Sequence, residues 1–302
     1  MRIEVENESV LRFGTGSPVR AASAIAPLGD GWLVAQDDAT HAAWYRPAGT
    51  TPVRVLPAVD GHEVFSSAAG TKHLKPDFEA ACAVEAGVLL LGSGSTRARM
   101  RSSLVTTAAD GPGFAVADLT GLYDAVAGAL GTPAGRLNLE GACRQGDRLR
   151  WFQRGNPAAG VPSASVDVDL PGLLLAATGR AAPEAVRVDR ARPYDLGAAD
   201  GIPLAVTDAV ALPDGRILLS AAAEDTPNPV DDGPVVAAAL ALLDGDRVTA
   251  VTALPRRGGA VRKVEGLALH SADHRDGLRL LAVVDADDPE VPSALLHLRV
   301  LW

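Results

Sequence analysis

The sequence predicts an all-β fold, a single five-bladed β-propeller domain that occupies residues 1–302. Three observations lead to this prediction. Five stretches of the chain repeat one pattern, their spacing suits blades of four strands, and the N-terminus offers the strand that the last blade lacks.

The repeat is a polar residue followed by two short apolar strands. Each copy begins with an oxygen-bearing side chain, continues with a small residue or Asp and an apolar strand, and then has a polar turn and a second apolar strand. The five starting residues lie 56, 61, 67 and 58 residues apart: Ser23, Glu79, Glu140, Thr207 and Glu265. A period of about sixty residues with short strands is typical of four-stranded propeller blades.

The strands are clearest in the first, fourth and last blades. Those of the first blade are expected at Ala22–Leu28, Gly31–Gln36, Ala42–Arg46 and Val53–Leu56. Those of the fourth are expected at Thr207–Leu212, Arg216–Ser220, Val235–Leu243 and Arg247–Leu254. The last blade has three, at Glu265–His270, Leu278–Val284 and Ala294–Leu301. The N-terminal segment Ser9–Phe13 is expected to supply its fourth strand, which closes the ring and leaves no open sheet edge.

One segment departs from the strand pattern and predicts a short helix inserted between the second and third blades. Its apolar residues have helical spacing: Leu119, Leu122, Tyr123, Val126 and Leu130. Asp118 is expected to cap its start, and Gly131 with Pro133 to end it. We expect this helix to pack on one end of the ring.

The composition favours a cytoplasmic, monomeric protein that binds neither nucleic acid nor membranes. The net charge of -9 offers no attraction to polyphosphate or to an anionic membrane surface. No apolar run reaches membrane-spanning length, and the charged N-terminus lacks the apolar stretch of a secretory signal. The two cysteines, Cys82 and Cys143, do not indicate a disulfide framework. The Ala, Gly and Arg bias indicates a bacterial gene rich in G and C.

The repeated polar residues are candidate metal ligands, because the innermost strand of each blade lines the central channel. The residues expected to converge on the axis are Ser23, Glu79, Glu140, Thr207 and Glu265, with Asp208 beside Thr207. Carboxylates placed close together either take up protons or share a cation. Calcium accepts about six to eight oxygen ligands and is therefore the expected cofactor. The alternative is purely structural: the same side chains can hydrogen-bond backbone amides and water and so hold the blades together.

The order of the anchors and three local segments resemble one known family. The anchors read Ser, Glu, Glu, Thr, Glu, and the segments are "QDDATH" at Gln36–His41, "LYDAVAGALGTPAGRLNLEGAC" before and through the third carboxylate, and "KVEGLAL" at Lys263–Leu269. They resemble the calcium-activated nucleotidases, the five-bladed apyrases. The resemblance implies an axial calcium ion, held blade by blade through the anchors, and hydrolysis of phosphoanhydrides.

The sequence also departs from that family. Ala39 stands where the family's loop has an arginine, and "GSGSTRARMRSS" replaces a K-E-W segment. The family is commonly secretory, whereas this chain shows no signal sequence. The resemblance therefore supports the fold and the metal site more strongly than it supports nucleotidase activity. An uncharacterised bacterial family with this scaffold and another substrate is the alternative.

Charged residues gather in the loops at one end of the predicted ring. Those expected to bind an anionic ligand are Lys72, His73, Lys75, Arg97, Arg99, Arg154 and Lys263. Asp37 and Asp38 are the expected catalytic residues, as general bases for a metal-bound water. Further acids at this end are Asp77, Glu224, Asp225, Asp285 and Asp287. Any one of the arginines could instead be an ordinary solvated loop residue.

Two functions from different classes follow. The first is a calcium-dependent hydrolase of phosphate esters or phosphoanhydrides. The second is a non-catalytic binding module, in which calcium is structural and a rigid face binds a small anionic ligand, a sugar or a protein. A lactonase-like propeller hydrolase is disfavoured, because such rings usually have six blades and an Asn-rich metal shell.

Overall fold

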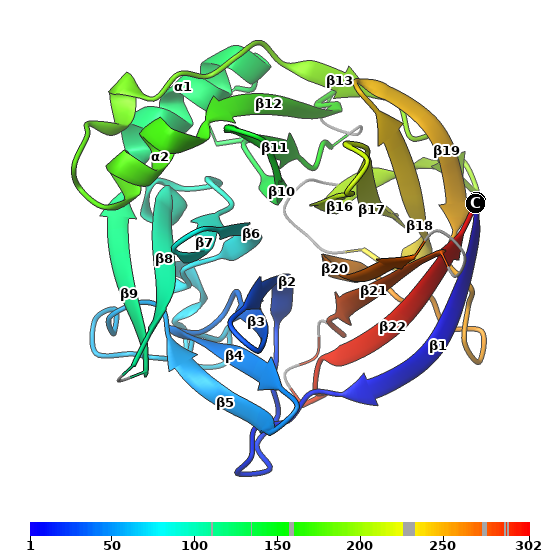
Figure 1. The fold of residues 1–302 in the computed structure, drawn as a ribbon, viewed down its shortest axis with the longest axis horizontal. Helices are drawn as coiled ribbons and strands as arrows, with labels where there is room; N and C mark the ends of the chain where they lie inside the picture. Colours follow the sequence, from blue (N-terminus) through cyan, green and yellow to red (C-terminus); the bar gives the residue numbers. More distant parts are fainter. Residues whose placement is uncertain are drawn as a thin grey trace.

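Five four-stranded antiparallel sheets surround a central axis, as predicted (Figure 1). The structure is a computed structural model, and it describes all residues except 110, 134, 157–159, 226–232, 274–276, 287 and 289. The innermost strands of neighbouring sheets contact each other in cyclic order, so the ring is closed. Within the described residues, no helix is both long and apolar enough to cross a membrane.

Each sheet runs from an innermost to an outermost strand. The first contains β2 (Ala22–Leu28), β3 (Gly31–Gln36), β4 (His41–Arg46) and β5 (Gly49–Arg54). The second contains β6 (Phe78–Val84), β7 (Gly87–Gly92), β8 (Arg101–Ala108) and β9 (Gly111–Asp118). The third contains β10 (Leu139–Gln145), β11 (Arg148–Gln153), β12 (Ser163–Asp169) and β13 (Arg192–Tyr194). The fourth contains β16 (Ala205–Ala211), β17 (Ile217–Glu224), β18 (Val235–Asp244) and β19 (Arg247–Ala253).

The fifth sheet joins the two ends of the chain. It contains β20 (Val264–Asp273), β21 (Gly277–Val284), β22 (Ala294–Leu301) and, outermost, β1 (Arg2–Val10). The prediction of an N-terminal closing strand is confirmed, but its position was wrong, since only Ser9 and Val10 of the predicted segment belong to β1. Ile3 anchors this strand and is buried, whereas Glu4, Glu6 and Glu8 form ion pairs with arginines and hide the strand pattern in the sequence.

The predicted helix is α1 (Thr120–Leu130). The Asp118 carboxylate accepts a hydrogen bond from the Thr120 backbone at 2.8 Å, and Gly131 ends the helix with a φ of 62°. A second helix, α2 (Leu170–Ala177), was not predicted. It is short, and its sequence "LPGLLLAA" contains a proline and a glycine. Both helices lie at the outer edge of the ring, beside the second and third sheets (Figure 1).

Short elements complete the loops between sheets. A two-stranded hairpin is formed by β14 (Ala198–Ala199) and β15 (Ile202–Pro203). Single 3₁₀ turns are η1 (Lys72–Leu74), η2 (Arg97–Arg99) and η4 (Pro183–Ala185).

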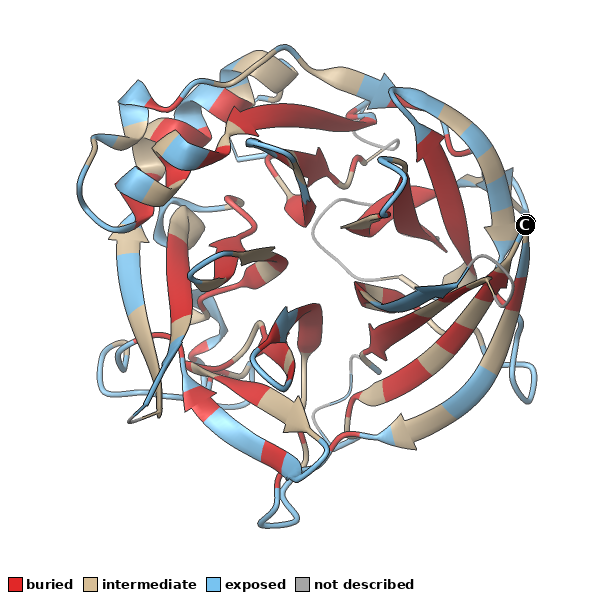
Figure 2. Ribbon diagram, viewed as in Figure 1, coloured by how far each residue is buried: buried red, intermediate tan, exposed pale blue. Residues whose placement is uncertain are grey.

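Apolar side chains fill the spaces between adjacent sheets. Buried residues concentrate on the inner three strands of each sheet, while the residues of the outermost strands are mostly intermediate or exposed (Figure 2). The innermost strands are therefore held on both faces by neighbouring sheets. This packing fixes the positions of the side chains that point toward the axis.

Closure by β1 predicts a difference in stability between two positions on that strand. Ile3→Ala removes buried methyl groups and should lower the free energy of unfolding by roughly 2 kcal/mol. Val10→Ala, at a residue that is 59% exposed, should change it by less than about 0.5 kcal/mol. Urea unfolding followed by fluorescence measures both. Equal effects of the two substitutions would show that β1 does not contribute to the core.

Candidate functional site

Each innermost strand carries a β-bulge at its repeated polar residue. The pairing of the first strand with the second skips this residue in every sheet, and the fifth sheet has a second bulge at His270. The repeated residues that are skipped are Ser23, Glu79, Glu140, Thr207 and Glu265. A bulge redirects a side chain out of the regular alternation of a strand. The five residues therefore occupy equivalent positions around the axis, although they are not all used in the same way.

The two hydroxyl-bearing anchors connect neighbouring blades. Ser23 Oγ donates a hydrogen bond to the carbonyl of Phe78 at 2.5 Å, and Thr207 Oγ1 donates one to the carbonyl of Val264 at 2.6 Å. In both cases the acceptor directly precedes the carboxylate anchor of the next blade. These hydroxyls thus fix the strand that carries the neighbouring glutamate, and they remain able to act only as acceptors toward a further group.

Two clusters of charged side chains flank the axis. The first, which we call the Lys75 cluster, consists of Asp37, Lys75, Asp77, Glu79 and Arg99. Lys75 Nζ lies 2.5 Å from Asp37 Oδ2 and 2.6 Å from Asp77 Oδ1. Arg99 Nη1 lies 3.0 Å from Asp77 Oδ2. The cluster draws its residues from the first and second blades and from the loops at one end of them.

Asp77 is the most constrained member of the Lys75 cluster. Its φ of 57° places a non-glycine residue in the left-handed region, which the surroundings must impose. Its backbone N–H donates to the Asp37 carbonyl at 3.1 Å, and its own carbonyl accepts from the Ser93 N–H at 2.9 Å. The Ser93 hydroxyl also donates to its carboxylate. The side chain is consequently held in one position beside Lys75 and Arg99.

The second cluster, which we call the Arg154 cluster, consists of Glu140, Arg154, Glu224, Lys263 and Glu265. Arg154 lies 2.9 Å from Glu140 and 2.5 Å from Glu224. Lys263 lies 2.7 Å from Glu224 and 2.8 Å from Glu265. The chain of contacts crosses the third, fourth and fifth blades, so it joins three sheets through charge-assisted hydrogen bonds.

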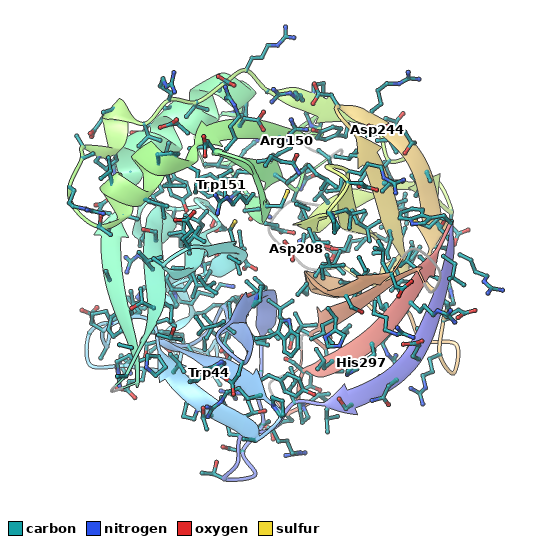
Figure 3. All side chains as sticks on the ribbon, viewed as in Figure 1. Trp44, Arg150, Trp151, Asp208, Asp244 and His297 are labelled. Carbon is teal, nitrogen blue, oxygen red and sulfur yellow. The ribbon has the colours of Figure 1, made fainter. Side chains whose placement is uncertain are left out.

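Some acidic oxygens near the axis have no partner. The Glu79 carboxylate makes no hydrogen bond or ion pair with any residue that the structure describes. Glu140 Oε2 and Asp208 Oδ1 are buried and likewise unpartnered within the described part of the chain. Asp208 projects toward the centre of the ring (Figure 3), where its other oxygen accepts from the Leu267 N–H at 2.6 Å. Unpaired buried carboxylate oxygens are costly unless they hold a proton or a cation.

Burial makes most of these acids reluctant to ionise. It raises the pKa of Asp37, of Glu79 and of Glu140 above the ordinary values, and negative neighbours add to the rise. The pKa of Glu265 is raised to about 7 by burial, against the opposing effect of Lys263. Asp77 differs: burial favours a higher pKa, but Lys75 and Arg99 hold the pKa of Asp77 below its ordinary value.

Asp37, Asp77 and Glu79 form a group that fits a metal ion. One carboxylate oxygen from each lies within 4.8 Å of the others. Two oxygens on opposite sides of a calcium ion are about 5 Å apart, since each Ca–O distance is about 2.3–2.6 Å. Of the five predicted ligands, Glu79 alone belongs to this group. Asp37, predicted as a general base, also belongs to this group.

The predicted ligand-binding cations are divided by the structure. Those in ion pairs with acids of the two clusters are Lys75, Arg99, Arg154 and Lys263. Lys72 and His73 are exposed on η1, and Arg97 lines a cavity of about 460 Å³ at the outer edge of the ring with Asp118 and Thr120. The sequence identified the charged residues at this end, but not their pairing.

The two aspartates of the first blade, Asp37 and Asp38, have different surroundings. Asp38 Oδ2 lies 3.9 Å from Arg20 Nη2, and the Asp38 side chain is 21% exposed. Asp38 does not belong to the group of three carboxylates that could hold a metal ion. The pKa of Asp38 is raised to about 6 by burial and by Asp37. Asp208 and Glu224 are two further acids near the axis. The sequence indicated Asp208 by its place beside the anchor Thr207, and Glu224 by its place after an apolar strand. Asp287 lies outside the described residues.

Comparison with a solved structure supports the fold. A hypothetical protein from Leishmania major covers 98% of this chain and 91% of its own length, with 12% identity and a TM-score of 0.50. A glucose dehydrogenase covers the full length of both chains with 12% identity, but its TM-score is 0.36. No curated protein matches the chain.

A family model matches residues 71–289, which include the second, third and fourth sheets, β20 and β21 of the fifth, and all of the Lys75 cluster except Asp37. The apyrase family named from the sequence is not found among these matches, whereas the expectation of an uncharacterised family is met. The chain belongs to the family of unknown function DUF6910.

Proposed function

We propose that this protein binds a divalent cation at the axis of the propeller, with calcium as the preferred ion. The observation that carries the proposal is the approach of Asp37, Asp77 and Glu79 to within 4.8 Å, with the Glu79 carboxylate unpaired among the described residues. The resemblance of the anchors to those of the calcium-activated nucleotidases also supports calcium. All ligands offered are oxygens, which suit a hard cation.

The charge balance of the site supports a cation. The Lys75 cluster has three carboxylates and two basic side chains, and the Arg154 cluster has the same composition. Each cluster therefore carries one net negative charge when all groups are ionised. Asp208 adds a further carboxylate without a basic partner among the described residues. A bound divalent cation would relieve the mutual repulsion of these acids without requiring them to be protonated.

Removal of the ion should destabilise the protein, and Glu79 should control the effect. Calcium at about 100 times its dissociation constant adds roughly 2.7 kcal/mol to the free energy of unfolding. Wild-type protein stripped with EDTA should therefore regain melting temperature as calcium is titrated back. Glu79→Gln should weaken calcium binding by about tenfold or more, because it removes a ligand charge.

Glu85→Gln is the matched control, since Glu85 lies in the turn between β6 and β7 and its side chain is 91% exposed. This substitution should leave the calcium response unchanged. Isothermal titration calorimetry supplies the dissociation constants. If wild-type protein and Glu79→Gln respond to calcium equally, Glu79 is not a ligand.

Without a cation, the axis should make stability dependent on pH. Glu265 has a raised pKa in the folded protein, about 7 against an ordinary 4.5, so its protonated form favours the folded state. The stability that it contributes is complete below about pH 4.5 and is lost as the pH rises through about 7, an effect of roughly 3 kcal/mol at most. Urea unfolding in EDTA at pH 5 and pH 8 measures this loss.

Glu265→Gln should abolish that part of the pH dependence, because glutamine stays uncharged throughout. Glu85→Gln again serves as the control and should follow wild-type protein at both pH values. A wild-type pH dependence that persists in Glu265→Gln would assign the proton to another axial acid.

A second candidate function, hydrolysis of phosphate esters or phosphoanhydrides, is favoured by the position of Asp38. This carboxylate follows a proposed ligand directly, is partly exposed, and lies near the cation Arg20. It could take a proton from a water bound to the ion. Lys72 and His73, both exposed on η1 at the same end, are available to a phosphate group.

Phosphate release from nucleoside di- and triphosphates tests this second function. Wild-type protein should release phosphate only with calcium, and Asp38→Asn should lower the rate about a hundredfold, as expected for loss of a general base. Asp30→Asn, at an exposed turn of the same blade, is the control and should retain the wild-type rate. Calcium binding with no phosphate release would leave a binding module with a structural ion.

A further inference from the structure

Lysine is rare in this chain and is concentrated at one end of the propeller. The 28 basic residues comprise 25 arginines and three lysines, which are Lys72, Lys75 and Lys263. Lys72 is exposed, whereas the side chains of Lys75 and Lys263 are only 16% and 8% exposed and belong to the two axial clusters. A chain that uses arginine almost everywhere thus places a lysine in each cluster.

The Lys75 ammonium lies between two of the three carboxylates that could hold a metal ion. It is 2.5 Å from Asp37 and 2.6 Å from Asp77, distances close to the 2.3–2.6 Å of calcium–oxygen contacts. These two aspartates, together with Glu79, form the group of carboxylates that could hold a metal ion. The ammonium is a compact point charge on a flexible stem, unlike the planar, multiply bonded guanidinium of Arg99 on the other side of Asp77.

We propose that Lys75 is an internal counter-ion of this site, and that a divalent cation enters by displacing its ammonium group from Asp37 and Asp77. The inference rests on the proposed cation site and adds the residue that controls its occupancy. An ammonium and a divalent ion cannot share the same carboxylate oxygens at these distances, because their positive charges would repel each other.

Displacement is sterically available to Lys75. The residue directly follows η1, on a loop whose neighbours Lys72 and His73 are exposed, and its own side chain already reaches solvent in part. Asp77, in contrast, is fixed through its backbone and through Ser93 and Arg99. The Asp77 carboxylate therefore stays in place while the lysine leaves, and the displaced lysine exposes its amine at this end of the ring.

Amine acylation of the intact wild-type protein tests the displacement. A limiting amount of an N-hydroxysuccinimide acetate is applied with EDTA or with saturating calcium chloride, and the modified peptides are quantified by mass spectrometry. With only three lysines, each site is resolved separately. We expect calcium to raise the acylation rate of Lys75 by about tenfold or more. Lys72 should react rapidly and equally in both conditions and serves as the internal control.

Substitution provides a second, independent measurement. Lys75→Met removes the competing charge and should tighten calcium binding by about tenfold in calorimetry. Lys72→Met removes the same charge from an exposed neighbour and should change the dissociation constant by less than about threefold. The acylation experiment does not depend on either variant being stable.

The outcomes separate this inference from the site on which it rests. If wild-type protein binds calcium but Lys75 acylation is unchanged, or if Lys75→Met binds calcium no more tightly, displacement is overturned and the cation site stands. If neither wild-type protein nor Lys75→Met binds calcium, the cation site itself is overturned, and the inference with it. Faster acylation of Lys75 with calcium, together with tighter binding by Lys75→Met, supports both.

Discussion

Convergence of five innermost strands on one axis is the constraint on which the rest of the molecule depends. Each strand delivers the side chain at its bulge to the same small region, and three of the five are glutamates. Carboxylates removed from water must be protonated, paired or bound to a cation. The loops at this end supply the partners, so their basic residues are explained first by the burial of acids and only then by any ligand.

The same charges serve stability and function. Arg154 and Lys263 link three blades through Glu224, and the hydroxyls of Ser23 and Thr207 fix the strand that carries the next glutamate. A ring locked in this way presents its remaining acids in fixed positions, which is what a metal site requires. A structural role for the axial residues and a role in cation binding are therefore compatible. The carboxylate oxygens without a partner among the described residues are not explained by the structural role.

Much of the fold could be predicted because each copy of the repeat is a local pattern within one or two neighbouring strands. A polar residue before an apolar run recurs five times, and the bulge at that residue is a local feature. Other features depend on contacts between distant segments. β1 was misplaced because its charged residues mask a single buried isoleucine, and α2 was missed because a helix of one or two turns with proline and glycine owes its stability to tertiary packing. The ion pair between Lys75 and Asp37 joins two blades, and the periodicity of the sequence does not predict it.

The presence of lysine instead of arginine at position 75 determines how readily the positive charge beside Asp37 and Asp77 can be displaced. An arginine at position 75 would bind both aspartates through several directed hydrogen bonds. The lysine ammonium also offsets part of their negative charge. Burial opposes the charge of Lys75, but Asp37 and Asp77 raise the pKa of Lys75 above its ordinary value. The offset comes from a single mobile charge. In the proposed displacement, a divalent cation carries twice that charge at the same distances and outcompetes the ammonium, so the same carboxylates would be balanced in part with or without the ion.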